Sequence, residues 1–203
     1  MEKLRPKITS RASRRLTREA WILQGFRALA AEGPAALKAE PLARAMGTSK
    51  GSFYWHFKDL AAFKAAVLEM WQHRAVADII AAVDQGGMGP ADRLYALVER
   101  ISEIDMDPYG GPQIEMALRD WGRSDALAAA ATEAVDQARL DWLEAVFRDL
   151  GGGARSDDLA RAAYGCFIGI PAVPGGGGDA GRRALAAVMA GLIGDAQAGG
   201  GVA

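Results

Sequence analysis

The sequence contains one cysteine and two histidines, and it has no long apolar run. Cys166 alone cannot form a disulfide within the chain, and two histidines cannot supply the common metal clusters. The longest uncharged stretch, residues 162–178, is interrupted by Pro171, Pro174 and four consecutive glycines, so it cannot serve as a membrane span. The charged N-terminus also lacks the apolar core of a signal peptide. We therefore expect no metal, no cofactor, no membrane contact and a reducing, cytoplasmic location.

The chain also lacks the alternation of apolar and polar residues that is typical of strands. Its apolar residues, 50% of 203, recur three or four positions apart instead. This content can bury a core in one large or two small domains. The pattern predicts an all-α fold, with helices at 17–32, 39–46, 49–57, 59–83, 91–104, 113–121, 126–150, 157–170 and 179–196.

The net charge of -1 conceals an asymmetry along the chain. Residues 1–60 hold 12 Lys and Arg against 5 Asp and Glu, whereas residues 61–203 hold 12 against 20. A basic segment on an acidic body is typical of a protein that meets a polyanion at one end. A solvated, charge-rich tail would give the same composition, so charge alone leaves both interpretations open.

Within the basic part, a tight turn joins two short helices. Pro41 falls in the first turn of the earlier helix, where a missing N–H is tolerated. Gly47 supplies the left-handed residue that ends this helix, and Thr48 or Ser49 caps the next one. Two short helices joined around a glycine predict a helix-turn-helix.

Two motifs resemble those of enzymes but lack the required context. Residues 47–51 match the G-x-S-x-G nucleophile elbow, yet that elbow follows a strand and this one follows a helical pattern. Gly176, Gly178 and Gly181 fit G-x-G-x-x-G, but no strand leads into them. His56 stands in a basic, aromatic segment that suits a phosphate or base-edge contact. We therefore expect no catalytic residues.

The aromatic run 53–57 gives the second of the two helices distinct inner and outer faces. Phe53 and Phe57 lie four apart on one face, which we assign to the core. Packing of the whole run inside a core is the alternative, but five consecutive rings cannot all face inward on a helix of about 3.6 residues per turn. Gly51 costs about 1 kcal/mol relative to Ala, which fits a backbone that approaches DNA closely. We expect base contacts from Lys50, Ser52 and Trp55, and phosphate contacts from Thr48, Ser49, Tyr54, His56 and Lys58.

The stretch from residue 22 to 58 resembles the N-terminal domain of the tetracycline-repressor (TetR) family of bacterial transcriptional regulators. The specific core of this resemblance is Gly-x-Ser-x-Gly-x-x-Tyr-x-x-Phe, at residues 47–57. It implies a basic arm at 1–14, a DNA-binding domain at 15–75 with its helix-turn-helix at 38–57, a helical effector and dimerisation domain at 76–197, and a disordered tail at 198–203. Family members usually carry Ser or Thr where this chain has Lys38, which cannot cap a helix but can grip phosphate.

The resemblance also implies a homodimeric repressor that binds double-stranded DNA at a palindromic operator and responds to a small molecule. The last two helices would form the dimer surface, although an ordinary internal core is the alternative. The middle helices would enclose an apolar or aromatic effector, since Met and aromatic side chains suit adaptable apolar pockets. Candidates, each of which plain core packing would also explain, are Met70, Trp71, Met106, Tyr109, Met116, Trp121, Trp142, Phe147 and Phe167.

Two other functions stay open at this point. A helical small-molecule-binding protein or enzyme could carry an incidental basic N-terminus. An interaction protein could use the long helices alone, and would then bind its partner without residues 1–60.

Overall fold

The computed structural model describes residues 16–84, 87–103 and 111–199, and every regular element within them is helical. This confirms the all-α prediction. The expectations for the arm at 1–14, for Met106 and Tyr109 and for residues 200–203 fall outside the described residues. In chain order the helices are α1 (Arg18–Glu32), α2 (Ala39–Ala45), α3 (Lys50–His56), α4 (Leu60–Gln72), α5 (Asp78–Val83), α6 (Pro90–Glu103), α7 (Gly111–Gly122), α8 (Ala126–Asp149), α9 (Ser156–Gly169) and α10 (Gly178–Gly199).

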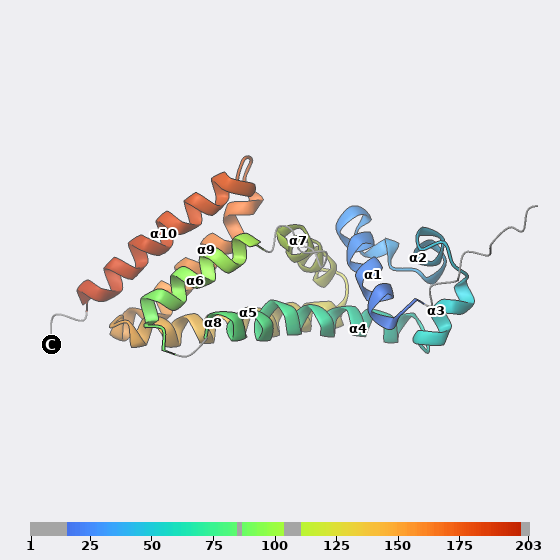
Figure 1. Ribbon diagram of the computed structural model, residues 1–203, viewed down its shortest axis with the longest axis horizontal. Helices are drawn as coiled ribbons and strands as arrows, with labels where there is room; N and C mark the ends of the chain where they lie inside the picture. The colour runs from blue at the N-terminus through green and yellow to red at the C-terminus, as the bar shows by residue number, and fades with distance from the viewer. Residues whose placement is uncertain (1–15, 85–86, 104–110, 200–203) are drawn as a thin grey trace, which may run out of the picture.

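The molecule is elongated, with α1 to α3 at one end and α6, α9 and α10 at the other (Figure 1). Two long rods, α4 continued by α5 and the single helix α8, run along the molecule and connect the two ends (Figure 1). Helix α7 lies between the ends and packs on both α1 and α8. The last helix ends far from α3, so the two ends of the molecule can serve different partners.

One sequence prediction requires a correction between residues 59 and 83. The apolar pattern predicts a single amphipathic helix, but the structure divides it into α4, a π-helical turn at His73–Ala77, and α5. A π-helical turn admits one extra residue into the helix and rotates the apolar stripe that follows. The apolar periodicity predicts the helical state correctly, but it cannot show the single extra residue of the π-helical turn.

Two apolar cores hold the fold together. The first joins α1 to α4 with Ala75 of the π-helical turn, α7 and the first half of α8. The second joins α6, the second half of α8, α9 and α10. Because α8 contributes to both cores, a shift of α8 in one core must be felt in the other.

Helices α1 and α4 approach each other closely at Gly25. A Cβ atom at this position would lie 2.7 Å from Cζ of Phe63 and 3.2 Å from Cγ2 of Val67. Phe63 and Val67 are both fully buried, so the first core is built around the missing side chain.

The two ends of the last helix differ slightly from expectation. Helix α10 continues through Gly199, two residues into the segment expected as a tail.

None of the helices in the described ranges is long and apolar enough to cross a membrane.

Candidate nucleic-acid interface and effector cavity

The start of α3 is set by three consecutive residues after α2. Gly47 adopts a left-handed φ of 63°, as its position at the helix end predicts. The Thr48 N–H donates to the Ala43 carbonyl at 2.9 Å, which anchors the turn to α2. Ser49 is the N-cap, and its hydroxyl accepts a hydrogen bond from the Ser52 N–H at 3.4 Å. The orientation of α3 against α2 is therefore fixed by backbone contacts that leave the outer face of α3 clear.

Two phenylalanines on the inner face of α3 attach it to the first core. Phe53 is completely buried and Phe57 is 3% exposed. The Phe53 ring meets Trp21 of α1 edge-on at 5.4 Å between centroids, and Phe63 of α4 at 5.2 Å. Aromatic edge contacts of this kind give directional packing in addition to buried area. Helix α3 is thus held by both α1 and α4.

The outer face of α3 carries the side chains expected to read DNA. Trp55 is 79% exposed and Tyr54 is 48% exposed, which is unusual for such large rings. Lys50 is exposed, and its Nζ lies 5.9 Å from the centre of the Tyr54 ring. Gly51 is exposed as well, with only Ser49 Oγ, at 3.6 Å, near the place of a Cβ atom. The outer face therefore presents cationic, aromatic and bare backbone surface together.

The remaining candidates flank this face. Thr48, Ser52 and His56 are half-buried, whereas Ser49 and Lys58 are exposed. Ser49 is partly engaged, because its oxygen caps α3 while its hydroxyl proton can still be donated.

Two cationic side chains near α3 bear on the interface. Lys38 is exposed at the start of α2 and makes no side-chain cap hydrogen bond, as expected for lysine. Arg18 of α1, which the sequence did not single out, lies with its guanidinium carbon 5.4 Å from the centre of the Phe57 ring. It is exposed beside the end of α3, where only the packing of α1 against α3 reveals it.

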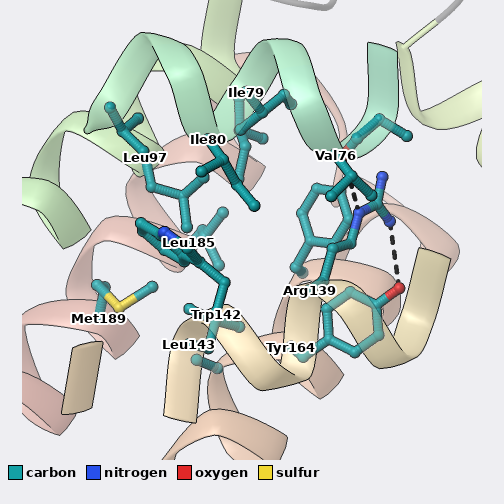
Figure 2. Close-up of a pocket in the computed structure, with 15 residues that line it drawn as sticks. Val76, Ile79, Ile80, Leu97, Arg139, Trp142, Leu143, Tyr164, Leu185 and Met189 are labelled. Atoms are coloured by element: carbon teal, nitrogen blue, oxygen red, sulfur yellow. Dashed lines mark hydrogen bonds between the residues drawn. The ribbon is translucent and has the colours of Figure 1, made fainter. Parts of the chain in front are cut away.

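A second candidate site is an apolar cavity where α6, α9 and α10 pack beside α5, α8 and the π-helical turn. It has a volume of about 60 Å³, small beside the roughly 300–1,000 Å³ of typical ligand pockets, so a ligand must move side chains to enter. The side chains come from the π-helical turn and from α5, α6, α8, α9 and α10 (Figure 2). They are Ala75, Val76, Ile79, Ile80, Val83, Leu97, Ile101, Arg139, Trp142, Leu143, Ala163, Tyr164, Phe167, Leu185 and Met189.

Of the nine expected pocket residues, the structure brings two, Trp142 and Phe167, into this cavity. Met116 is 49% exposed and lines a neighbouring groove with Phe167. Met70 lines a shallow groove between α1 and α4.

Three others pack as ordinary core. Trp71 and Trp121 belong to the first core, and Phe147 belongs to the second. Helical periodicity gives the buried side of a helix, but it does not tell which buried side chains border an empty space.

A cluster of five polar residues lies at one end of the cavity. This polar cluster consists of Glu115 and Arg119 of α7, Asp136 and Arg139 of α8, and Tyr164 of α9. Arg119 donates to Asp136 at 2.6 and 2.9 Å, to Glu115 at 2.8 Å and to the Tyr164 hydroxyl at 2.9 Å. The Tyr164 hydroxyl donates to Asp136 at 2.6 Å. The cluster therefore ties three helices together.

Arg139 connects the polar cluster to the cavity and to the rod that leads toward α3. Its Nη1 donates to Glu115 and to the Tyr164 hydroxyl, both at 3.1 Å. Its Nε donates at 3.3 Å to the carbonyl of Ala75, which lies in the π-helical turn (Figure 2). The guanidinium carbon also lies 5.3 Å from the centre of the Phe167 ring.

The electrostatics of the polar cluster favour the charged forms of Arg119 and Asp136 and the neutral form of Tyr164. Hydrogen bonding to Asp136 is the main cause that raises the pKa of Arg119. Burial alone would raise the pKa of Asp136, but hydrogen bonds from Arg119 and Tyr164 outweigh it and lower that pKa. Burial raises the pKa of Tyr164 to about 12, against the opposing influence of Arg139.

Arg139 and Tyr164 carry no signal in the sequence that marks them as site residues. Arg139 falls among other polar residues of a long helix, and Tyr164 falls among small residues, so neither stands out. Only the packing of α7, α8 and α9 brings them together with two carboxylates.

The N-terminal part of the chain matches a known protein family. Residues 22–67 match the model of the family described as bacterial regulatory proteins, tetR family. A search of the curated proteins gave no match.

Solved structures match over nearly the whole chain. A TetR-family transcriptional regulator from Streptomyces coelicolor shares 16% identity over 89% of this chain and 96% of its own, with a TM-score of 0.73. A transcriptional regulator from Rhodococcus shares 18% identity over 90% and 98%, with a TM-score of 0.72. A candidate regulator from Saccharomonospora viridis, in complex with choline, shares 14% identity over 86% and 92%, with a TM-score of 0.68. Residues 22–67, around α3, therefore carry the DNA-binding domain of the tetR family of bacterial regulatory proteins, and the chain has the fold of solved transcriptional regulators over most of its length.

Proposed function

We propose that the protein is a ligand-responsive homodimeric repressor that reads a palindromic operator through α3. The observation that carries this proposal is the outer face of α3, where Trp55 and Tyr54 stand exposed beside Lys50 while Phe53 and Phe57 hold the helix from inside. Exposed aromatic rings are unfavourable in water unless a partner covers them. A helix of these dimensions fits the major groove of B-DNA, where cationic and hydroxyl side chains reach base edges.

Within this proposal the roles along α3 follow the chemistry of the side chains. Lys50, Ser52 and Trp55 contact bases. Thr48, Ser49, Tyr54, His56 and Lys58 contact phosphates, Lys38 adds a further phosphate contact, and Gly51 lets the backbone come close. The DNA-binding domain takes residues 15–75 and the effector and dimerisation domain residues 76–197.

The homodimer is proposed to form through the outer faces of α9 and α10. Ala163, Leu185 and Met189 are buried within the second core, so for them the internal packing is the correct interpretation. Ala162 and Gly165 of α9 are exposed, as small residues at a close helix contact would be in a single chain. One α3 offers too few base contacts for a unique site, and a two-fold dimer doubles them.

The effector is proposed to be a largely apolar small molecule bound in the cavity beside the polar cluster. The cavity lies next to the π-helical turn of the rod that continues to α3, so a ligand that widens it displaces that rod. A ligand changes DNA affinity only if it prefers one position of α3 over the other.

An electrophoretic mobility shift with the DNA upstream of the protein's own gene, repeated over a series of salt concentrations, tests the core of the proposal. We expect a specific complex whose affinity falls steeply with salt, because phosphate contacts release counterions. Absence of any specific, salt-sensitive complex would exclude the repressor and favour a helical binding protein or enzyme with a basic end. Sequencing of DNA selected by the purified protein would then define the operator.

A further inference from the structure

The polar atoms that border the cavity are almost all engaged. The indole N–H of Trp142 donates to Asp84 at 3.3 Å. The Tyr164 hydroxyl donates to Asp136 and accepts from Arg119 and Arg139, which uses its full capacity. Neither group has a hydrogen-bonding position left for a ligand.

Arg139 is the exception. A guanidinium has five N–H groups, and three of them are used by the Ala75 carbonyl, Glu115 and Tyr164. Its second terminal nitrogen, Nη2, has no hydrogen-bond partner among the residues that the structure describes. Because Arg139 lines the cavity, this nitrogen is the donor that remains for a ligand bound beside it.

The charges around Arg139 decide which ligand suits it. The polar cluster contains two arginines, two carboxylates and one neutral tyrosine, so its formal charge is already balanced. An anionic ligand would add an uncompensated negative charge to an apolar cavity, and an uncharged acceptor would not.

A cationic ligand is disfavoured for a second reason. Cations bind in such cavities over aromatic faces. Here the guanidinium of Arg139 already lies over the rings of Tyr164 and Phe167, at 5.8 and 5.3 Å from their centres. The choline bound by the Saccharomonospora protein is therefore the wrong kind of ligand for this cavity.

We propose that the effector is an uncharged, largely apolar molecule with one hydrogen-bond acceptor, such as a ketone, ester or ether oxygen, and that Arg139 donates to this acceptor. The inference rests on the effector role proposed above. The body of the ligand would contact Ile80, Leu97, Leu185 and Met189, which surround the rest of the cavity (Figure 2). Met189 is unbranched and can change conformation to make room.

Isothermal titration calorimetry of the full chain with four compounds of equal carbon number tests this inference. They are benzylacetone (a neutral acceptor), butylbenzene (no acceptor), phenylbutyrate (an anion) and phenylbutylamine (a cation). We expect benzylacetone to bind tightest, about tenfold or more above butylbenzene, the difference that one hydrogen bond to a charged donor gives. Equal binding of these two, tighter binding of phenylbutyrate or phenylbutylamine, or no binding of any compound would overturn the inference.

Three variants separate recognition from general damage. Arg139→Met is expected to bind benzylacetone and butylbenzene equally. Arg139→Lys keeps a cation beside Glu115, but its three N–H donors are no more than the Ala75 carbonyl, Glu115 and Tyr164 already accept. It is therefore expected to lose the same preference even if Arg139→Met fails to fold. Ile80→Ala, in the same cavity, is expected to weaken both compounds by a similar factor. A preference for benzylacetone that survives in a folded Arg139 variant contradicts the assignment.

Operator binding by the same preparations, measured without any compound, keeps the two proposals distinct. If the protein binds its operator but shows no preference for benzylacetone, the ligand class is wrong and the repressor stands. If operator binding is absent, the repressor is wrong whatever the ranking of the four compounds.

Discussion

At the scale of single residues, aromatic side chains two positions apart on α3 have opposite environments. Phe53 is completely buried, and its neighbour Trp55 is 79% exposed. The same run of rings thus serves two purposes, because a helix turns successive side chains by about 100°. Lys50 stands at the front of this face and is the side chain best suited to guanine.

Replacing Lys50 with alanine should weaken operator binding by about 1–3 kcal/mol and leave binding to unrelated DNA nearly unchanged. The physical reason is that a base contact contributes only at the correct sequence. Fluorescence anisotropy with operator and scrambled duplexes at one salt concentration measures both affinities. An equal loss on both duplexes would show that Lys50 contacts phosphate, and Lys58→Ala, a proposed phosphate contact, provides the comparison.

Tyr164 makes a second prediction at this scale, through its ionisation. The folded-state pKa of about 12 lies above the ordinary value of about 10, so the folded protein holds the proton longer than the unfolded chain. The stability that Tyr164 contributes is therefore complete below about pH 10 and is lost as pH rises through about 12.

Absorbance at the tyrosinate band should show one tyrosine of the wild type that titrates near pH 12 and is missing from Tyr164→Phe. Urea unfolding of both proteins between about pH 9 and 12 should show a steeper alkaline loss in the wild type. Titration of Tyr164 together with the exposed tyrosines would contradict its place in the polar cluster.

At the scale of helices, two glycines in the DNA-binding part have opposite surroundings: one is in a filled core and the other is on an open face. Gly25 lies where α1 meets α4, and any Cβ atom there collides with the buried Phe63. Gly51 lies on the open face of α3, where a Cβ atom finds room. The same substitution at the two sites therefore separates packing from function.

Gly25→Ala is expected to destabilise the protein by about 1–3 kcal/mol, since an extra methyl group in a filled core forces side chains or helices apart. Thermal or urea unfolding measures this change. A neutral effect would mean that α1 and α4 are farther apart than the structure shows.

Gly51→Ala is expected to raise stability by up to about 1 kcal/mol, because alanine is the better helix former. We nevertheless expect it to weaken operator binding, since the added methyl group stands between the α3 backbone and DNA. Unfolding and anisotropy measurements on one preparation give both values. A variant that is more stable and binds the operator as well as the wild type would remove Gly51 from the interface.

At the scale of the whole molecule, charge and shape agree. Of the basic part of the sequence, the described residues 16–60 form the end that carries α3, and the acidic remainder includes α9 and α10 at the opposite end (Figure 1). This arrangement fits the proposal that one end contacts DNA and the other contacts a second copy of the chain.

Gly165→Arg places a large cation on the proposed dimer face of α9 without touching the second core, since no atom lies within 4 Å of the added Cβ. Sedimentation equilibrium should show a dimer for the wild type and a monomer for the variant. The loss of the dimer should lower the operator affinity of the variant, while its far-UV circular dichroism stays unchanged. A dimeric Gly165→Arg would move the interface elsewhere. Ala134→Arg, which adds the same cation at an exposed position of α8 away from α9 and α10, is the control and is expected to stay dimeric.

By itself, the sequence determined the helices, the caps at Gly47 and Ser49, and the inner and outer faces of α3. Helical periodicity, the turn at Gly47 and the Ser49 cap are local, and each follows from a few neighbouring residues. The split of Phe53 and Phe57 from their aromatic neighbours is local as well. Expectations of this kind matched the structure to within a few residues at the helix ends.

The tertiary structure decided everything that depends on residues far apart in the chain. The π-helical turn, the close contact at Gly25 and the placement of Arg18 beside Phe57 are of this kind. The cavity is also of this kind. Trp71, Trp121 and Phe147 are aromatic residues on helices just as Trp142 and Phe167 are, yet only Trp142 and Phe167 border the cavity. The polar cluster joins Glu115 to Tyr164 across three helices. These side chains meet only because the helices pack together, and a pattern of neighbouring residues cannot predict that packing.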